Sequence, residues 1–205
     1  LQNLPVVFLV DRAGVVGADG CTHQGVFDIS YLSHIPNMTI LAPKDSRELE
    51  LAVNYALKLS SPVAIRYPNG KIENKGEIKP FESGLWTTEK IGDGAVILAS
   101  GARMLKIALE AAEETSAEVV NARTIKPLDE DYLKKISSRK IITLEDNSLI
   151  GGFGSLVTEF FVKNGVSPKI TSLGIADKFI DHASVASQLE KNSLDKEAVK
   201  KLIEQ

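Results

Sequence analysis

The chain has 205 residues, of which 43% are hydrophobic and 25% are charged, and its formal net charge is −3. This composition is typical of a globular protein and excludes a collagenous, disordered or disulfide-stapled chain. The small net charge argues against nucleic-acid binding, and the single cysteine, Cys21, excludes an internal disulfide and a multi-cysteine zinc site. No apolar run reaches the roughly 20 residues of a membrane span. No signal peptide is recognisable, so we expect a cytoplasmic protein without a membrane partner.

The chain begins LQNLPVVFLV, without Met and directly in an apolar run, which fits a processed protein and equally a fragment cut from a longer one. Strand-like and helix-like segments alternate through residues 1–70, and such alternation predicts a parallel sheet. The first run is β-branched and nearly continuous, so we expect a strand buried on both faces. Asp45-Ser-Arg-Glu48 resembles a capping box at a helix start. The predicted elements are strand 4–10, Gly-rich loop 11–25, helix 26–35, strand 38–41, a helix after Asp45, and strand 62–65.

Residues 71–82 are charged, contain Gly and Pro and show no apolar period, so they predict a linker. The alternation resumes over residues 83–205 and predicts a second α/β unit of ordinary domain size. Asp129 is the expected N-cap of one helix, and Gly165 suits the left-handed end of another. The predicted elements are strand 95–99, helix 102–115, strand 118–121, helix 129–136, strand 140–144, helix 154–164, strand 169–173 and helix 195–204. The fold class is therefore α/β, with two consecutive domains rich in parallel sheet.

Polar side chains follow two strands of the first unit. Arg12 and Arg66 come just after the first and third predicted strands, and the Gly-rich loop carries Asp19 and His23. Ligands of open parallel sheets bind outside the carboxyl ends of the strands. Guanidinium groups can hold phosphate oxygens bidentately, Asp19 can accept from hydroxyls, and His23 can donate to an oxygen that gains charge or transfer a proton. This set suits a small, phosphorylated and hydroxylated substrate.

Each of these residues also has a structural interpretation. An arginine at a strand end is commonly solvated or ion-paired, Asp19 before Gly20 can form a turn, and His23 can be a structural hydrogen-bonding group. Cys21 and His23 form a weak candidate for a nucleophile and its base, because residues two apart in a loop are not thereby aligned.

Other candidate groups are weaker still. His34 and His182 have no metal-ligand partners at suitable spacing. The glycines of Gly151-Gly-Phe-Gly154 precede a predicted helix and could cradle an anion. A tight turn is the stronger interpretation, since the full dinucleotide pattern is absent.

At this point several motifs resemble one known family, the 1-deoxy-D-xylulose-5-phosphate synthases. The first unit contains LPVVFLVDRAGVVGADGCTHQGVFDISYLSHIPNMTILAP and PVAIRYPNG, and the second contains LASGARM, NARTIKPLDE, TLEDNSLIGGFGS and LGIADKFIDHA. DG-x-THQ is shared with the wider transketolase group, whereas DRAG, VVGADG and GVFDISYL narrow the resemblance to the synthase. The chain departs from the family pattern at two positions. Ala176 stands where the family often has Pro, and Cys21 stands at a position that varies in the family. Neither residue takes part in the expected chemistry.

The resemblance implies a transketolase-type transferase that uses thiamine diphosphate and Mg²⁺ and works as a homodimer. Its members join pyruvate and D-glyceraldehyde 3-phosphate, with loss of CO2, into 1-deoxy-D-xylulose 5-phosphate. The product feeds isoprenoid biosynthesis by the non-mevalonate route and also thiamine biosynthesis. By resemblance, Arg12 and Arg66 match the positions that hold the aldehyde's phosphate. Asp19 and His23, the candidate catalytic residues, match polar positions that face the cofactor-bound intermediate and the acceptor.

The resemblance also implies that this chain covers only part of the family's architecture. Residues 1–70 match a partial pyrimidine-binding domain, and residues 83–205 match a transketolase-like C-terminal domain, expected to support folding and subunit contacts. The domain that binds diphosphate and metal, and the glutamate that activates the aminopyrimidine, lie outside it. We therefore expect no cofactor-binding or metal-binding residue here, no cofactor bound, and an inactive chain when it is alone.

Two other functions stay open at this stage. The chain can belong to a different thiamine enzyme, either a transketolase or the β subunit of a 2-oxo acid dehydrogenase. It can also be a non-catalytic module that assembles with a partner or binds a phosphorylated metabolite without turnover. The DRAG and RYP-x-G motifs favour the synthase over the other thiamine enzymes.

Overall fold

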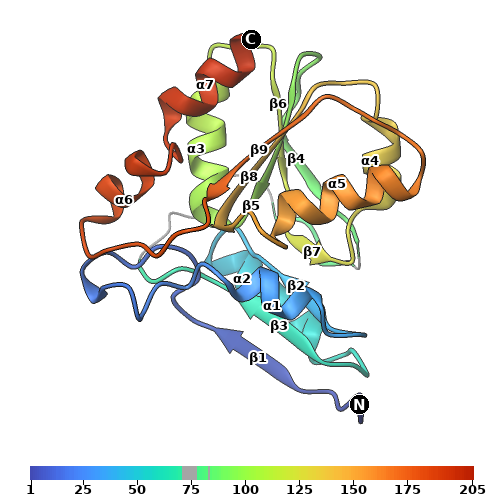
Figure 1. Cartoon of the computed structure of the whole chain (residues 1–205). Coiled ribbons are helices and arrows are strands. Elements are labelled where there is room, and N and C mark those ends of the chain that lie inside the picture. The colour runs from blue at the N-terminus through green and yellow to red at the C-terminus, as the bar shows by residue number, and fades with distance from the viewer. Residues whose placement is uncertain (71–77, 83) are drawn as a thin grey trace.

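The computed structural model describes residues 1–70, 78–82 and 84–205 and contains two sheets with helices around them (Figure 1). Within these ranges, no helix has both the length and the apolar character that crossing a membrane requires. In chain order the elements are β1 (Val7–Val10), η1 (Gly17–Asp19), α1 (Asp28–Ser33), β2 (Thr39–Leu41), α2 (Ser46–Ala56), β3 (Val63–Arg66), β4 (Thr87–Lys90), β5 (Val96–Ser100), α3 (Ala102–Ala112), β6 (Glu118–Asn121), β7 (Thr124–Lys126), α4 (Glu130–Lys135), β8 (Ile141–Ser148), α5 (Phe153–Lys163), β9 (Ile170–Ile175), α6 (Val185–Lys191) and α7 (Lys196–Glu204).

The larger sheet has the strand order β4-β6-β5-β8-β9, and all its pairs are parallel except the β4–β6 pair at one edge. Helices α3 and α7 lie on one face, and α4 and α5 on the other (Figure 1). Side chains of the fully buried β5 alternate between these faces, as a strand requires. Ile97 packs in the cluster that contains Met104 of α3, whereas Leu98 packs in the cluster that contains Phe153 of α5. The prediction of a parallel α/β sheet in this unit is confirmed.

The smaller sheet has the order β1-β3-β2-β7. Its first three strands are parallel, as predicted, but β7 comes from the second unit and pairs antiparallel with β2. Helices α1 and α2 pack on opposite faces, because Ile40 joins the cluster of Ile29, whereas Leu41 joins the cluster of Ala52. The sequence patterns predict neither β4 nor β7, so they miss the strand that joins the second unit to the first sheet.

The prediction that the first strand is buried on both faces is wrong. β1 lies at the edge of the smaller sheet, where β3 is its only partner strand in the described part of the chain. Phe8 and Leu9 are consequently 48% and 56% exposed. A continuous apolar run indicates that a strand is stable in an apolar environment, but it does not show which part of the protein covers the strand. The described residues leave Phe8 and Leu9 about half exposed.

Local capping signals locate the helix starts well. The Asp45 carboxylate accepts the backbone N–H of Glu48 at 2.8 Å, and Asp129 caps α4 in the same way through Tyr132. The capping box is only half right, because the Glu48 carboxylate accepts from the N–H of Lys44, at 2.7 Å, instead of that of Asp45. Gly165 follows α5 with a φ of +69°, as predicted. The short α6 and η1 are not predicted.

The predicted linker 71–82 is described only in part, since residues 71–77 lie outside the described residues. Phe81, at its end, is buried beneath the guanidinium of Arg123, 4.5 Å from its ring centroid. Arg123 also donates to the carbonyl oxygen of Lys79 at 3.0 Å and forms a buried ion pair with Glu48. The end of this segment is therefore packed between the two units.

Candidate functional site

The Gly-rich loop, residues 11–25, leaves β1 and closes on itself. Gly14 and Gly25 exchange N–H···O bonds of 2.6 and 2.8 Å, and Gln24 Oε1 accepts the N–H of Val16 at 2.8 Å. A Cβ on Gly25 would lie 2.0 Å from the carbonyl oxygen of Arg12, so this closure requires glycine. The compact loop presents Arg12, Asp19 and His23 at its exposed surface.

The structure brings two of the predicted site residues together, Arg12 and Asp19. Arg12 Nε lies 3.7 Å from Asp19 Oδ2, while Arg12 Nη1 lies 2.7 Å from Asp11 Oδ2. The Arg12 and Asp19 side chains are 49% and 44% exposed. Such exposed pairs contribute about 0–1 kcal/mol, so an incoming phosphate dianion can compete for this guanidinium.

His23 is exposed and lies four residues beyond Asp19. Its Nδ1 is 3.0 Å from the hydroxyl oxygen of Thr22, and this is the contact found for its ring among the described residues. No bond joins it to Cys21 in the described part of the chain, and Cys21 is exposed. The geometry therefore does not assemble the nucleophile and base considered from the sequence.

Arg66 lies in a different environment from Arg12. It is the last residue of β3, and its side chain is only 3% exposed. Its Nε and Nη2 donate to the two carboxylate oxygens of Asp28, at 2.7 and 3.1 Å, and Nη2 also donates to the carbonyl oxygen of Asp146 at 3.2 Å. Asp28 has no distinctive sequence signal of its own, although its place in GVFDISYL is part of the family resemblance.

Further charges surround this buried pair. Burial alone would lower the pKa of Arg66, but Asp28, Asp146 and Glu145 together raise it above its ordinary value, so the guanidinium stays charged. Burial raises the pKa of Asp146 against the opposing effect of Arg103, with which it forms an ion pair. The site thus combines an exposed rim with a charged, buried floor contributed by both units.

Arg66 still has donors to offer. A guanidinium carries five N–H groups, and no described residue accepts from Nη1. A Cβ on Gly101 would stand 3.8 Å from this atom. A small cavity on this side of Arg66 is also lined by Ala13 and Ser100. The unused donors therefore face the junction between the Gly-rich loop and the start of α3.

The glycine-rich turn before α5 binds an anion from within the chain. The carboxylate of Glu145 accepts the N–H groups of Phe153 and Gly154 at 2.7 and 2.8 Å. Burial raises the pKa of Glu145 to about 7, although these two hydrogen bonds oppose the rise. The anion cradle considered at 151–154 is thus occupied by this side chain, and the interpretation as a turn is favoured.

The remaining histidines do not extend the site. His34 Nδ1 lies 2.6 Å from the carbonyl oxygen of Ser30, within one helical turn, and His182 is exposed. Among the described residues, no group of three or more His, Cys, Asp or Glu side chains could hold a metal ion.

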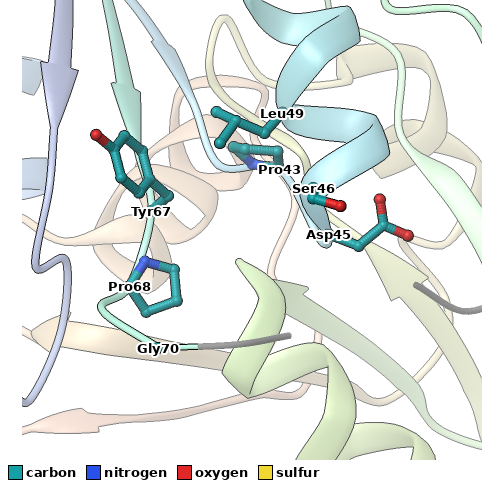
Figure 2. Close-up of a pocket in the computed structure, with 7 residues that line it drawn as sticks. All are labelled: Pro43, Asp45, Ser46, Leu49, Tyr67, Pro68 and Gly70. Atoms are coloured by element: carbon teal, nitrogen blue, oxygen red, sulfur yellow. The ribbon is translucent and has the colours of Figure 1, made fainter. Parts of the chain in front are cut away.

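A separate hollow of about 100 Å³ lies beside the segment that follows β3 (Figure 2). Tyr67 and Pro68 form one side of it, and residues from the start of α2 form the other. Among the described residues, the only carboxylate that lines the hollow belongs to Asp45. It caps α2, and its Oδ2 lies 3.1 Å from Nη2 of Arg47. This hollow has no unengaged charged group among its lining residues that would mark it as a substrate site.

Two family models match the chain in succession. "Transketolase, pyrimidine binding domain" matches residues 1–74, and "Transketolase, C-terminal domain" matches residues 84–199. The second match alone covers more than half of the chain.

Several curated relatives are similar over nearly the whole chain, and each is named 1-deoxy-D-xylulose-5-phosphate synthase. A protein from Thermus thermophilus is 45% identical over 99% of this chain, and that from Clostridium tetani is 46% identical over 98%. The alignments cover 33% and 34% of those proteins. The chain therefore spans about a third of the length of the curated relatives it matches.

Solved structures agree with this placement. A chain titled "Split gene transketolase, inactive beta4 tetramer" superposes with a TM-score of 0.86 at 28% identity, over 97% of this chain and 66% of that one. Transketolase from Leishmania mexicana superposes with a TM-score of 0.74 at 20% identity, over 98% of this chain and 30% of that one. The second likeness supports the fold alone.

Proposed function

Because the chain belongs to the transketolase family, we propose that it forms the C-terminal part of a 1-deoxy-D-xylulose-5-phosphate synthase. The whole protein then joins pyruvate to D-glyceraldehyde 3-phosphate, with loss of CO2. The observation that carries this proposal is the Gly-rich loop, which has the synthase-like DRAG and DG-x-THQ motifs and exposes Arg12, Asp19 and His23. Identities of 43–46% to relatives of that name support it.

Arg12 is proposed as the outer phosphate contact. Its present partners, Asp11 and Asp19, are solvated and weakly held, so a phosphate group can replace one of them. A bidentate, charge-assisted contact to phosphate is stronger than either exposed pair.

Arg66 is proposed as the inner contact that acts without leaving Asp28. Its Nε and Nη2 stay with Asp28 and Asp146, which hold the guanidinium plane in place. The Nη1 side then donates to the phosphate. Holding the aldehyde by its far end positions its carbonyl group, which is a proximity effect.

His23 and Asp19 are proposed to act at the carbonyl end of the aldehyde. Formation of the new carbon–carbon bond places negative charge on the aldehyde oxygen, and a donor at His23 stabilises that charge where it develops. Asp19 accepts a hydrogen bond from a substrate hydroxyl. Both groups lie on the exposed surface of the loop, where a substrate can reach them.

Thiamine diphosphate, when bound, supplies the electron sink for this class of reaction. Among the described residues, no group of three or more His, Cys, Asp or Glu side chains fits the metal ion that accompanies its diphosphate. Glu145, the buried carboxyl group with a raised pKa, is engaged by the start of α5 and is not available to a cofactor. We therefore assign this chain to the handling of the aldehyde and propose that cofactor and Mg²⁺ are held elsewhere in the whole protein.

The assembly is also a proposal. A homodimer in the cytoplasm suits an enzyme of this family, and the isolated chain is proposed to be inactive. A similar solved chain whose title names an inactive tetramer of a split transketolase is in keeping with the proposed inactivity, not with a dimer in particular.

A domain exchange tests the proposal. The last third of the Thermus thermophilus relative is replaced by this chain, and formation of 1-deoxy-D-xylulose 5-phosphate from the two substrates is measured. We expect a hybrid that is active with D-glyceraldehyde 3-phosphate and much less active with unphosphorylated D-glyceraldehyde. The unmodified relative is the control.

The rival functions give different results in the same experiment. A folded hybrid that binds thiamine diphosphate but forms no product would contradict the proposal and favour a non-catalytic module. Transfer of a two-carbon ketol group between sugar phosphates would favour a transketolase. Titration of the 205-residue chain alone with thiamine diphosphate and Mg²⁺ tests whether this chain binds the cofactor by itself. Binding at micromolar concentration would contradict the proposal that the cofactor is held elsewhere in the whole protein.

A further inference from the structure

The tip of the Gly-rich loop has few contacts of its own. Its only regular element is η1, a single turn of three residues that ends at Asp19. The closing bonds between Gly14 and Gly25 lie at the base of the loop, away from this turn. Something else must therefore hold η1 in one conformation if Asp19 and His23 are to meet a substrate reproducibly.

The second unit supplies that contact through Gln188 of α6. Its Oε1 accepts the N–H of Gly17 at 2.9 Å, and its Nε2 donates to the carbonyl oxygen of the same residue at 3.0 Å. One side-chain amide thus satisfies both backbone groups of Gly17, across 171 residues of sequence. Gln188 is 1% exposed, so water does not compete for these bonds.

Gln188 is itself fixed in place. Its Nε2 also donates to the carbonyl oxygen of Asp181 at 2.9 Å, so all its strong hydrogen-bonding positions face the polypeptide. Gly17 adopts a φ of +74°, and a Cβ there would lie 3.4 Å from the carbonyl oxygen of Ala183. Figure 1 shows the loop after β1 passing beside the segment that leads into α6. The turn and α6 are therefore tightly matched.

A second contact from the same unit supports the base of the turn. The N–H of Val15 donates to Asp146 Oδ1 at 3.1 Å, and a Cβ on Gly14 would lie 2.0 Å from Asp146 Oδ2. Asp146 also forms the ion pair with Arg103 and favours the charged form of Arg66, so its removal would disturb several interactions at once. Among the described residues, the side chain of Gln188 forms hydrogen bonds only with Gly17 and Asp181, which makes it the residue to test.

We propose that Gln188 is a positioning residue for the aldehyde step: it fixes Gly17, and through η1 it sets the places of Asp19 and His23. This inference rests on the proposed function. The C-terminal unit then contributes to the reaction itself, in addition to its expected support of folding and subunit contacts. No substrate atom needs to approach Gln188, because the effect travels through the backbone of η1 to Asp19 and then to His23, whose N–H donates to the carbonyl oxygen of Gly20 at 3.2 Å.

The first test measures the loop without any reaction. Hydrogen exchange of the 205-residue chain is followed for residues 13–25 in the wild type, in Q188A, and in E190A as a matched control on an exposed position of α6. We expect Q188A to lower amide protection at the turn by about tenfold, because the N–H of Gly17 loses its acceptor and the Gly17 carbonyl oxygen keeps only the longer bond, of 3.4 Å, from the N–H of Ala183. E190A should change nothing. Unchanged protection in Q188A would overturn the proposal.

Q188E keeps the size of the side chain and separates positioning from simple loss of packing. An ionised carboxylate can accept from the N–H of Gly17 but cannot donate to its carbonyl oxygen, whereas a protonated carboxyl group can do both. We expect the protection of the turn in Q188E, relative to the wild type at each pH, to recover as the pH falls from about 7.5 to about 5. Protection that is low at every pH would contradict the pairing seen in the structure.

The second test uses the hybrid enzyme described above. In Q188A we expect kcat/KM for D-glyceraldehyde 3-phosphate to fall about tenfold, while decarboxylation of pyruvate without the aldehyde stays within about twofold. Equal losses in both reactions would overturn positioning and show a general loss of folded enzyme. If the exchange result holds but the unmodified hybrid makes no product, the proposed function fails instead, so the two failures are distinguishable.

Discussion

The buried pair between Arg66 and Asp28 permits a quantitative prediction. Both side chains are 3% exposed and are joined by two hydrogen bonds, of 2.7 and 3.1 Å. Removing one partner leaves the other charge buried without compensation, which costs about 3–5 kcal/mol. We therefore expect R66M to lower the free energy of unfolding by about 3–5 kcal/mol, a large part of the roughly 5–15 kcal/mol that is typical of folded proteins.

The pair also predicts coupling. D28N alone should be destabilising, but D28N/R66M removes both charges together. The double variant should be more stable than the sum of the two single effects by about 1–3 kcal/mol, since neither charge is then left alone. Lys163→Met, which removes one partner of the exposed pair with Glu159, is the control and should change stability by under about 0.5 kcal/mol.

Urea denaturation of the chain measures all four variants. Its only tryptophan, Trp86, is 9% exposed and packs against Phe153 and Tyr132, so its fluorescence reports on unfolding. A cost below about 1 kcal/mol for R66M, or strict additivity in the double variant, would refute the view that this is a tightly desolvated ion pair. The measured stability also determines how a loss of catalytic activity in R66A is interpreted. If R66M is strongly destabilised, the lower activity of R66A reflects partial unfolding as well as the lost phosphate contact.

Three further predictions follow from the site and the sheet edge. In the hybrid enzyme, His23→Gln should recover most of the kcat that His23→Ala loses, because glutamine keeps a donor near the aldehyde oxygen; steady-state kinetics measures this. The pKa of Glu145 is raised by burial to about 7, so the folded state binds its proton more tightly than the unfolded state. Its contribution to stability is then complete below about pH 4.5 and falls by about 2–3 kcal/mol as the pH rises to about 7; urea titrations should show a flatter profile for E145Q. Leu9→Lys, on the exposed edge strand β1, should reduce self-association of the chain in sedimentation measurements.

Each of these has a contrary outcome. Equal activity of the two His23 variants would favour proton transfer or steric fit over charge stabilisation. A wild-type profile as flat as that of E145Q would mean that folding does not raise the pKa of Glu145. Unchanged association of Leu9→Lys would show that the β1 edge is not the contacting surface.

The alternation of elements can be predicted from the sequence because its signals are local. Caps such as Asp45 and Asp129 act on an N–H three residues away, and the apolar period of a helix spans only a few turns. The patterns fail where the environment of an element depends on distant chain. β7 has three residues and is recognisable only through its pairing with β2, and the exposure of β1 depends on what lies beside the sheet.

The candidate site shows the same division. The residues at the strand ends could be identified from topology, because the ends of parallel strands share one edge. Their partners could not, since Arg66 meets Asp28 and not the loop that carries Asp19. An arginine at the end of a strand has the same sequence pattern whether its side chain turns outward, as Arg12 does, or inward beneath α1.

The two arginines have different physical properties, although both lie at the carboxyl ends of neighbouring parallel strands. Exposed Arg12 can exchange partners at little cost, which suits a group that must bind and release a phosphate in every cycle. Arg66 cannot exchange Asp28 without leaving a buried charge, so it can act only as a fixed donor. If both contact the same phosphate, loss of Arg12 should mainly speed release of the aldehyde, whereas the milder R66K should misplace it and lower the rate of bond formation. This difference between the two variants follows from the different burial of the two side chains. Single-turnover kinetics with D-glyceraldehyde 3-phosphate measures release and bond formation separately, and equal effects of both variants on both steps would contradict it.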